Sequence, residues 1–467
     1  MNSKPLTYDS LKTVILYMEP SIRILLSSRI PSIRAVERRV PLRIKELAVG
    51  NHHIRVNGTS YSYEVYQVDC AENVPEKVSG KSKLNFKTTC DVDKFGIRDY
   101  IIREGGMVPG NNGTVEKNLF GEYDRENIPT NEGRIERLKK LLEVEKERYN
   151  QLLNYCPNSK LNQGYNSMFK FIRLRDTIGR LYKQEEMELL ENEEMVKKAV
   201  KYTNEKIERM KKELLPFENR RNNIRPKFEI HVMKSRGISL PHLIERINYT
   251  KKLHKAGEYL IDAMFGKRRD VQTKLFRFSL GCAFQFPRGL KIKANELCFM
   301  GDGPLGLNLL GSIIDRSSFP LKKISIMKPF RNPREIDHEL IGNCKSLELT
   351  GQTYVLLPRL PTIQNKRVHL FVTRFYLEEQ TFITLIRSWI ETNKPIGTCF
   401  TFSTRENKQY AIEVLQFVNN QIEESVLGLN CVIIPMGDFK EMKINYERDR
   451  YSFLNDVYLI KMTVVSF

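Results

Sequence analysis

Residues 6–45 read LTYDSLKTVILYMEPSIRILLSSRIPSIRAVERRVPLRIK, and Pro20, Pro31 and Pro41 divide this stretch into short apolar segments. A proline lacks the backbone N–H and its ring clashes with the preceding turn, so it does not continue a helix interior. The pattern predicts three short helices, with Ser21 and Ser32 as N-caps of the second and third. A bundle this small buries little surface, so we expect residues 1–45 to be a docking module that depends on the rest of the chain or on a partner.

Composition limits the class of protein. The chain has 467 residues, enough for two to four domains, and 41% of them are hydrophobic, so a core can form. It contains no run of 18 apolar residues and no signal-peptide pattern, which disfavours a membrane span and secretion. Its eight cysteines form no Cys-x-x-Cys pair or zinc spacing. We therefore expect a cytoplasmic or nuclear protein without a metal site.

The net charge of +20 indicates an anionic partner. Residues 1–45 alone carry nine basic and three acidic residues. The partner could be an acidic protein or nucleic acid. The basic residues are dispersed and do not alternate with aromatic residues in one run, which disfavours nucleic acid.

The middle of the chain predicts three further regions. Residues 46–130 contain a β-hairpin around Asn57-Gly58, followed by a loop-rich stretch, because Asn-Gly tolerates the positive φ angles of a tight turn. Residues 131–216 have two apolar stripes at helical spacing and predict a helical hairpin that ends at Pro216. Residues 217–290 predict a mixed α/β connector, with a strand at 227–234 and a helix at 241–265.

Residues 291–467 predict repeated strand–helix units. Period-2 strands are expected at 297–299, 324–326, 347–349, 368–370 and 400–402, with steps of 27, 23, 23 and 30 residues between Leu297, Ile324, Leu347, Leu370 and Phe400. Residues 378–393 form the clearest helix, with Trp389 on its apolar stripe. Units of this length are typical of a leucine-rich-repeat-like arc, although an ordinary parallel α/β sheet remains open. Residues 431–467 predict closing strands with a hairpin near Asp449 to Asn455.

No motif supports catalysis. Gly301-Asp-Gly303-Pro-Leu-Gly306 fits a dinucleotide pattern, but the stretch that should carry the acidic partner contains Lys322, Lys323 and Lys328. The glycines at 105, 106 and 110 lack a following Gly-Lys-Ser/Thr. Asp337-His338-Glu339 lacks the second histidine of a zinc helix. We expect no catalytic residue, no cofactor and no metal.

Four segments resemble one family. Residues 6–44 resemble the degenerate F-box of the nematode-expanded F-box C family, whose other part is a domain of unknown function. Three further segments resemble the signature segments of this family. The first comprises Phe95–Tyr100, Gly105–Gly113 and Asn118–Gly121. The second comprises Tyr249–Ala256 with Phe265-Gly266 and Arg268-Arg269, and the third is Trp389–Phe400. The likeness covers nearly the whole chain. It departs in the order Pro5-Leu6, where F-boxes usually open Leu-Pro, and in having no tryptophan before Trp389.

The resemblance implies a non-enzymatic adaptor that recognises a protein substrate for a Skp1–cullin–F-box ubiquitin ligase. A Skp1-like adaptor and a cullin would then be partners. Leu6, Leu11, Val14, Leu25 and Leu26 would form the docking face or the bundle core, and the sequence leaves both roles open. A basic nucleic-acid-associated protein and a scaffold with a non-functional F-box are the alternatives. The expected fold is a multidomain α+β and α/β protein, with an F-box-like helical module (1–45), a β-hairpin region (46–130), a helical hairpin (131–216), a connector (217–290) and leucine-rich-repeat-like units (291–467).

Overall fold

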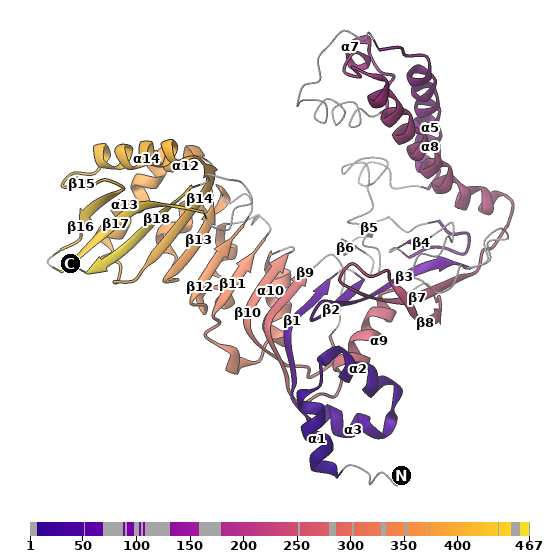
Figure 1. The fold of residues 1–467 in the computed structure, drawn as a ribbon, viewed down its shortest axis with the longest axis horizontal. Helices are drawn as coiled ribbons and strands as arrows, with labels where there is room; N and C mark the ends of the chain where they lie inside the picture. Colours follow the sequence, from indigo (N-terminus) through magenta and orange to yellow (C-terminus); the bar gives the residue numbers. More distant parts are fainter. Residues whose placement is uncertain are drawn as a thin grey trace. The chain divides into compact units, whose positions relative to one another are not determined.

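The computed structural model describes residues 7–50, 52–68, 87–88, 91–97, 102–103, 106–107, 131–157, 179–250, 253–279, 286–300, 303–327, 333–350, 354–372, 374–437, 439–449 and 458–466. The chain forms two compact units (Figure 1). The first unit comprises residues 1–61, 235–238 and 257–467, and the second comprises residues 62–234 and 239–256. The five-part division expected from the sequence remains a prediction.

The first unit begins with three short helices, α1 (Tyr8–Tyr17), α2 (Pro20–Arg29) and α3 (Pro31–Arg39). Pro20 and Pro31 occupy the first helical position, where the missing N–H is not needed and the fixed φ angle suits a helix. The side chain of Glu19 caps α2 by accepting a bond from the Ile22 N–H. The three expected helices are therefore present, but the prediction of Ser21 and Ser32 as N-caps is wrong, because each helix starts at its proline, two residues earlier than expected.

The main sheet of the first unit contains seven neighbouring parallel strands among the described residues, in the order β1-β9-β10-β11-β12-β13-β14. Antiparallel strands extend it: β2 beyond β1, and β18, β17, β16 and β15 beyond β14. The bounds are β1 (Leu42–Gly50), β2 (His53–Val56), β9 (Val271–Ser279), β10 (Ile292–Met300), β11 (Lys323–Ile326), β12 (Ser346–Leu349), β13 (Arg367–Phe371), β14 (Cys399–Glu406), β15 (Val426–Leu427), β16 (Cys431–Pro435), β17 (Lys440–Arg448) and β18 (Tyr458–Ser466).

Helices connect the parallel strands and cover one face of this sheet. They are α10 (Gly303–Ile313), η1 (Arg316–Ser318), η2 (Pro333–Asp337), α11 (Glu339–Gly342), η3 (Tyr354–Thr362), α12 (Arg374–Glu378), α13 (Gln380–Glu391) and α14 (Lys408–Gln421), where η marks a 3-10 helix. Trp389 of α13 is fully buried and packs edge-on against Phe400 of β14, with ring centroids 4.8 Å apart. Phe382 packs in the same way on Phe402. The apolar stripe on which the sequence places Trp389 therefore faces the core.

The strands expected at 297–299, 324–326, 347–349, 368–370 and 400–402 are present as β10 to β14. Their apolar residues alternate with half-buried ones, as in Ser325 beside the buried Ile324 and Ile326. Period-2 alternation identified these strands because one sheet face is packed under helices and the other is not. The closing strands are β16, β17 and β18, while residues 450–457 of the expected hairpin lie outside the described residues.

The second unit combines strands with a helical hairpin. Its elements are β3 (Thr59–Gln67), β4 (Lys87–Thr88), β5 (Ile102–Arg103), β6 (Gly106–Met107), α5 (Asn131–Leu153), α7 (Gln184–Met187), α8 (Glu193–Arg221), β7 (Phe228–Arg236), β8 (His242–Asn248) and α9 (Leu253–Phe265), of which β3, β7 and α9 run across the boundary between the units. Leu138 and Leu142 of α5 pack with Ile207 and Met210 of α8. The predicted helical hairpin is therefore present.

Two expected elements differ. The helix predicted at 241–265 is strand β8 followed by helix α9, because Leu243 and Ile247 lie four residues apart, a spacing that fits one face of a strand as well as one face of a helix. Helix α8 continues through Pro216 to Arg221, with Leu214 and Asn219 buried on either side, so packing overrides the proline. Residues 158–178 of the expected helical hairpin and most of the glycine cluster at 105–110 lie outside the described residues.

The predicted Asn57-Gly58 turn is present, with positive φ angles of 49° and 83°. The Asn57 side-chain oxygen accepts hydrogen bonds from the N–H groups of Lys45 and Glu46, at 2.8 and 3.1 Å. The preceding turn contains His52, which is buried, also has a positive φ angle of 56°, and has its pKa lowered by burial, and further by His53, to about 4. His52 is therefore neutral in the folded protein at pH 7.

We predict that His52→Asn makes the free energy of unfolding less sensitive to acid, because asparagine tolerates a positive φ angle and does not titrate. As the pH falls below about 6.5, His52 takes up a proton in the unfolded state first, so stability is lost until the folded pKa near 4 is reached. The wild type should lose about 3 kcal/mol more than the variant between pH 7 and pH 4. Denaturant unfolding at each pH measures this difference. His53→Asn is the control and should retain most of the loss, because burial is the larger cause of the lowered pKa of His52. Equal pH profiles for wild type and His52→Asn would contradict the assignment.

Candidate docking and recognition surfaces

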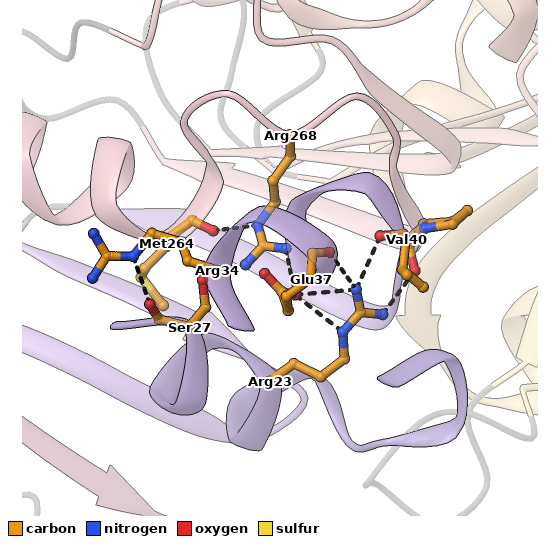
Figure 2. Close-up of polar contacts among 8 residues, drawn as sticks. Arg23, Ser27, Arg34, Glu37, Val40, Met264 and Arg268 are labelled. Atoms are coloured by element: carbon orange, nitrogen blue, oxygen red, sulfur yellow. Dashed lines mark hydrogen bonds and ion pairs between the residues drawn. The ribbon is translucent and has the colours of Figure 1, made fainter. Parts of the chain in front are cut away.

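A buried ionic cluster attaches the N-terminal helices to the rest of the first unit (Figure 2). Arg23 of α2 lies 3.0 Å from a carboxylate oxygen of Glu37 in α3, and Arg268, in the turn between α9 and β9, lies 2.5 Å from the same oxygen. All three side chains are at most 2% exposed. Glu37 therefore holds two arginines that are 245 residues apart in the chain.

Backbone carbonyl groups complete the cluster. Arg23 donates to the carbonyl oxygens of Glu37, Val40 and Pro41, and Arg268 donates to that of Met264 at 2.7 Å. Burial lowers the pKa of Arg23, Arg268 lowers it further, and Glu37 opposes both effects. Two cations share one carboxylate, so the carbonyl dipoles must stabilise the remaining positive charge. Nearby, Arg34 of α3 donates to the Ser27 carbonyl of α2 at 2.8 Å (Figure 2).

The N-terminal helices also expose large apolar side chains. Tyr17 is 83% exposed, and four further residues of α1 and α2 or their ends are between 37% and 49% exposed, namely Tyr8, Val14, Ile22 and Ile30. We call these five residues the apolar face. Single exposed apolar residues are ordinary, but several on two adjacent short helices mark a surface that a partner could cover.

The predicted docking residues take different places. Val14 is exposed and belongs to the apolar face. Leu11, Leu25 and Leu26 are half-buried and so contribute to both the bundle and its surface. Leu6 lies outside the described residues. The leucine and valine spacing predicted the docking residues and gave no signal for Tyr8, Tyr17, Ile22 and Ile30.

The face of the main sheet opposite the covering helices carries polar side chains. The pairing registers place seven of them in one row across β9 to β18, namely Arg277, Cys298, Ser325, Glu348, His369, Thr401 and Lys461. Ser325 donates to Glu348 at 2.5 Å, and Lys323 lies 2.8 Å from the same carboxylate. We call this row the polar row. Cys298 is buried and the other six residues are half-buried, so the row offers hydrogen-bonding groups in a fixed order along this face.

The polar row does not have the order that nucleophilic catalysis needs. A serine nucleophile requires a histidine between it and the acid. Here Glu348 lies between Ser325 and His369, and Ser325 donates directly to the carboxylate. Burial raises the pKa of the Cys298 thiol, which disfavours the reactive thiolate. Burial raises the pKa of Glu348 too, but the bonds from Lys323 and Ser325 outweigh it and leave this pKa below the usual value. The row is suited to binding.

A cleft of about 840 Å³ lies along α10, η1 and α11. Its polar lining includes Asn308, Arg316 and His338. His338 caps α11, because its Nδ1 accepts from the Leu340 N–H at 3.2 Å, so Nε2 carries the proton and donates to Asn308 at 3.1 Å. Both ring nitrogens thus have structural partners.

The motifs considered for chemistry gain no support. Helix α10 begins at Gly303 after β10, as a dinucleotide motif requires, but Gly301 and Asp302 lie outside the described residues. In the described part of the chain no group of three His, Cys, Asp or Glu side chains could hold a metal ion. Within the same residues no helix is long and apolar enough to cross a membrane.

One comparison with known proteins found a likeness. Residues 252–406, about a third of the chain from α9 to β14, match the family model of a domain of unknown function, DUF3557. No curated protein and no solved structure matches the chain. The match agrees with the expected domain of unknown function. The F-box part of the resemblance remains a prediction.

We predict that Glu37→Ala destabilises the first unit by about 3–5 kcal/mol, because it leaves two buried guanidinium groups without their carboxylate. Asp9→Ala is the control: Asp9 pairs with Lys12 at 3.3 Å, but its side chain is 90% exposed, so its removal should change stability by about 0.5 kcal/mol or less. Chemical denaturation of the full chain measures both. Similar small losses in the two variants would show that the cluster does not hold the N-terminal helices in place.

Proposed function

We propose that this chain is a non-enzymatic substrate-recognition adaptor of a Skp1–cullin–F-box ubiquitin ligase. Helices α1 to α3 would dock on a Skp1-like adaptor, which would connect the chain to a cullin, and the main sheet would bind a protein substrate. The observation that carries the proposal is the apolar face, five large side chains exposed on or beside α1 and α2. Such a surface is typical of a protein interface.

The attachment of the module supports a docking role. An adaptor can hold a substrate at a fixed place only if its docked helices are firmly attached to the part of the chain that binds the substrate. Arg23, Glu37 and Arg268 provide such a connection within the first unit. Interfaces gain most of their affinity from aromatic and large apolar anchors, and Tyr8 and Tyr17 are of this kind.

The repeated units support a recognition role. Strands β10 to β14 recur after steps of 23 to 30 residues, each followed by helical segments. We propose that they form a leucine-rich-repeat-like arc, in which stacked units share one core and present a continuous strand surface. The polar row would then contact the substrate. Its fixed side chains are suited to reading hydrogen-bonding groups of an extended surface.

A scaffold whose F-box does not function is the second candidate. The order Pro5-Leu6 and the absence of a tryptophan before Trp389 favour it. Such a scaffold would have the same buried cluster but would need no Skp1-like partner. A binding measurement with the adaptor therefore distinguishes the two candidate functions.

We predict that the double variant Val14→Glu and Tyr17→Glu weakens binding to a purified Skp1-like adaptor by about a hundredfold or more, because it places two charges in an apolar interface. Both side chains are exposed in the free chain, so the melting temperature should not change. Isothermal calorimetry with the full chain measures the affinity.

The matched control is Ser32→Glu with Ala35→Glu, two exposed positions on α3 outside the apolar face. It should bind within about threefold of wild type. Failure of the wild-type chain to bind, or equal binding by all three proteins, would reject the docking assignment and favour the scaffold.

A further inference from the structure

Lysines that are far apart in the sequence share one register position across parallel strands of the first unit, within β1 and β9 and one residue before β11, β12 and β13. The pairings Ile44↔Thr273, Glu46↔Leu275 and Glu296↔Leu275 align residues 45, 274 and 295. Three further pairings continue the row through residues 322, 345 and 366, namely Glu296↔Lys323, Leu321↔Cys344 and Ser346↔Arg367. Five of the six positions are lysines, here called the lysine row: Lys45, Lys274, Lys322, Lys345 and Lys366.

Backbone hydrogen bonds continue the pairing at these positions. The Lys322 N–H donates to Asn295 at 2.9 Å, and the Lys345 N–H donates to Leu321 at 2.9 Å. The sixth position of the row is Asn295. All six residues are exposed. Neighbouring strands lie about 4.8 Å apart, so five steps from β1 to β13 span about 24 Å.

The positive charge of the row is mostly uncompensated. Lys322 has Glu296 at 3.3 Å, but among the described residues the other four lysines form no ion pair. Like charges opposite one another on neighbouring strands destabilise a sheet. The arrangement therefore lowers the stability of the free chain, and an anionic ligand would remove the repulsion.

We infer that the lysine row binds an extended acidic segment of a protein. The inference rests on the proposed function, since it names the class of substrate that the main sheet would recognise. About 24 Å corresponds to about seven residues of extended chain, so a segment rich in Asp and Glu could contact the whole row.

The composition of the row favours a peptide over nucleic acid. No arginine lies in it to form bidentate bonds with phosphate, and no aromatic residue lies in it for a base to stack on. A lysine side chain is flexible and carries its charge at one point, so it requires a negatively charged partner but no particular arrangement of the partner's atoms. A purely structural role is the competing explanation, because Lys345 and Lys366 follow the C-terminal ends of α11 and η3, where a cation is favourable.

The test uses the full chain and a fluorescent polyglutamate peptide of about twelve residues at low salt, about 50 mM. The variant Lys322→Gln, Lys345→Gln and Lys366→Gln should weaken binding about tenfold or more and leave the melting temperature equal or higher. The control, Lys139→Gln, Lys140→Gln and Lys201→Gln, removes the same charge from exposed positions on α5 and α8 and should bind within about twofold of wild type.

Several results would overturn the inference: no peptide binding by the wild type, equal loss in row and control variants, or a lower melting temperature of the row variant, which indicates the structural role. Tighter binding of a DNA or RNA oligonucleotide of equal charge, lost with the row variant alone, would assign the surface to nucleic acid. The row variant should still bind the Skp1-like adaptor. If the wild type binds polyglutamate but no adaptor, the row stands and the ligase assignment falls.

Discussion

The carboxylate of Glu37 is the interaction on which the placement of the N-terminal helices depends. A three-helix module of this size has too small a core to be stable by itself. Glu37 overcomes this by accepting bonds from Arg23 within the module and from Arg268 in the turn before β9. Because the cluster is buried, its hydrogen bonds allow little change in geometry. Loss of one partner would leave a buried charge that water cannot solvate. The module is therefore fixed to the first unit and still exposes its apolar face.

The main sheet follows from a second constraint, that a strand–helix unit buries only one face. Phe400 and Phe402 lie under α12 and α13, while Ser325, Glu348 and His369 on the other face stay half-buried. The lysine row is exposed and crosses the same sheet, within β1 and β9 and just before β11, β12 and β13. One packing arrangement thus produces a core and two polar surfaces suited to binding. This arrangement suits the sheet to recognition and leaves the N-terminal helices for docking.

Local patterns in the sequence predicted the helices and strands well where each of them buries only one face. The strands from Leu297 to Phe402 and the helix of Trp389 were found because alternation and helical spacing report burial directly. The pattern at Leu243 and Ile247 suits either structure, and the pairing of β8 with β7 decided it. At Pro20 the rule that a proline ends a helix was applied, although this proline begins one.

The candidate surfaces were less predictable because they depend on contacts between distant residues. Arg268 lies 231 residues after Glu37, and no spacing rule connects them. The segment containing Arg268-Arg269 was noted only as a family resemblance. Similarly, the lysines appear dispersed along the chain, and only the strand register places five of them in one row.

Hydrogen–deuterium exchange of the full chain, with and without a purified Skp1-like adaptor, shows whether α1 and α2 are the docking helices. Docking through α1 and α2 predicts slower exchange of backbone amides in residues 8–29 when the adaptor is added, with little change in β9 to β18. Unchanged exchange in residues 8–29, or protection confined to the sheet, would contradict the account.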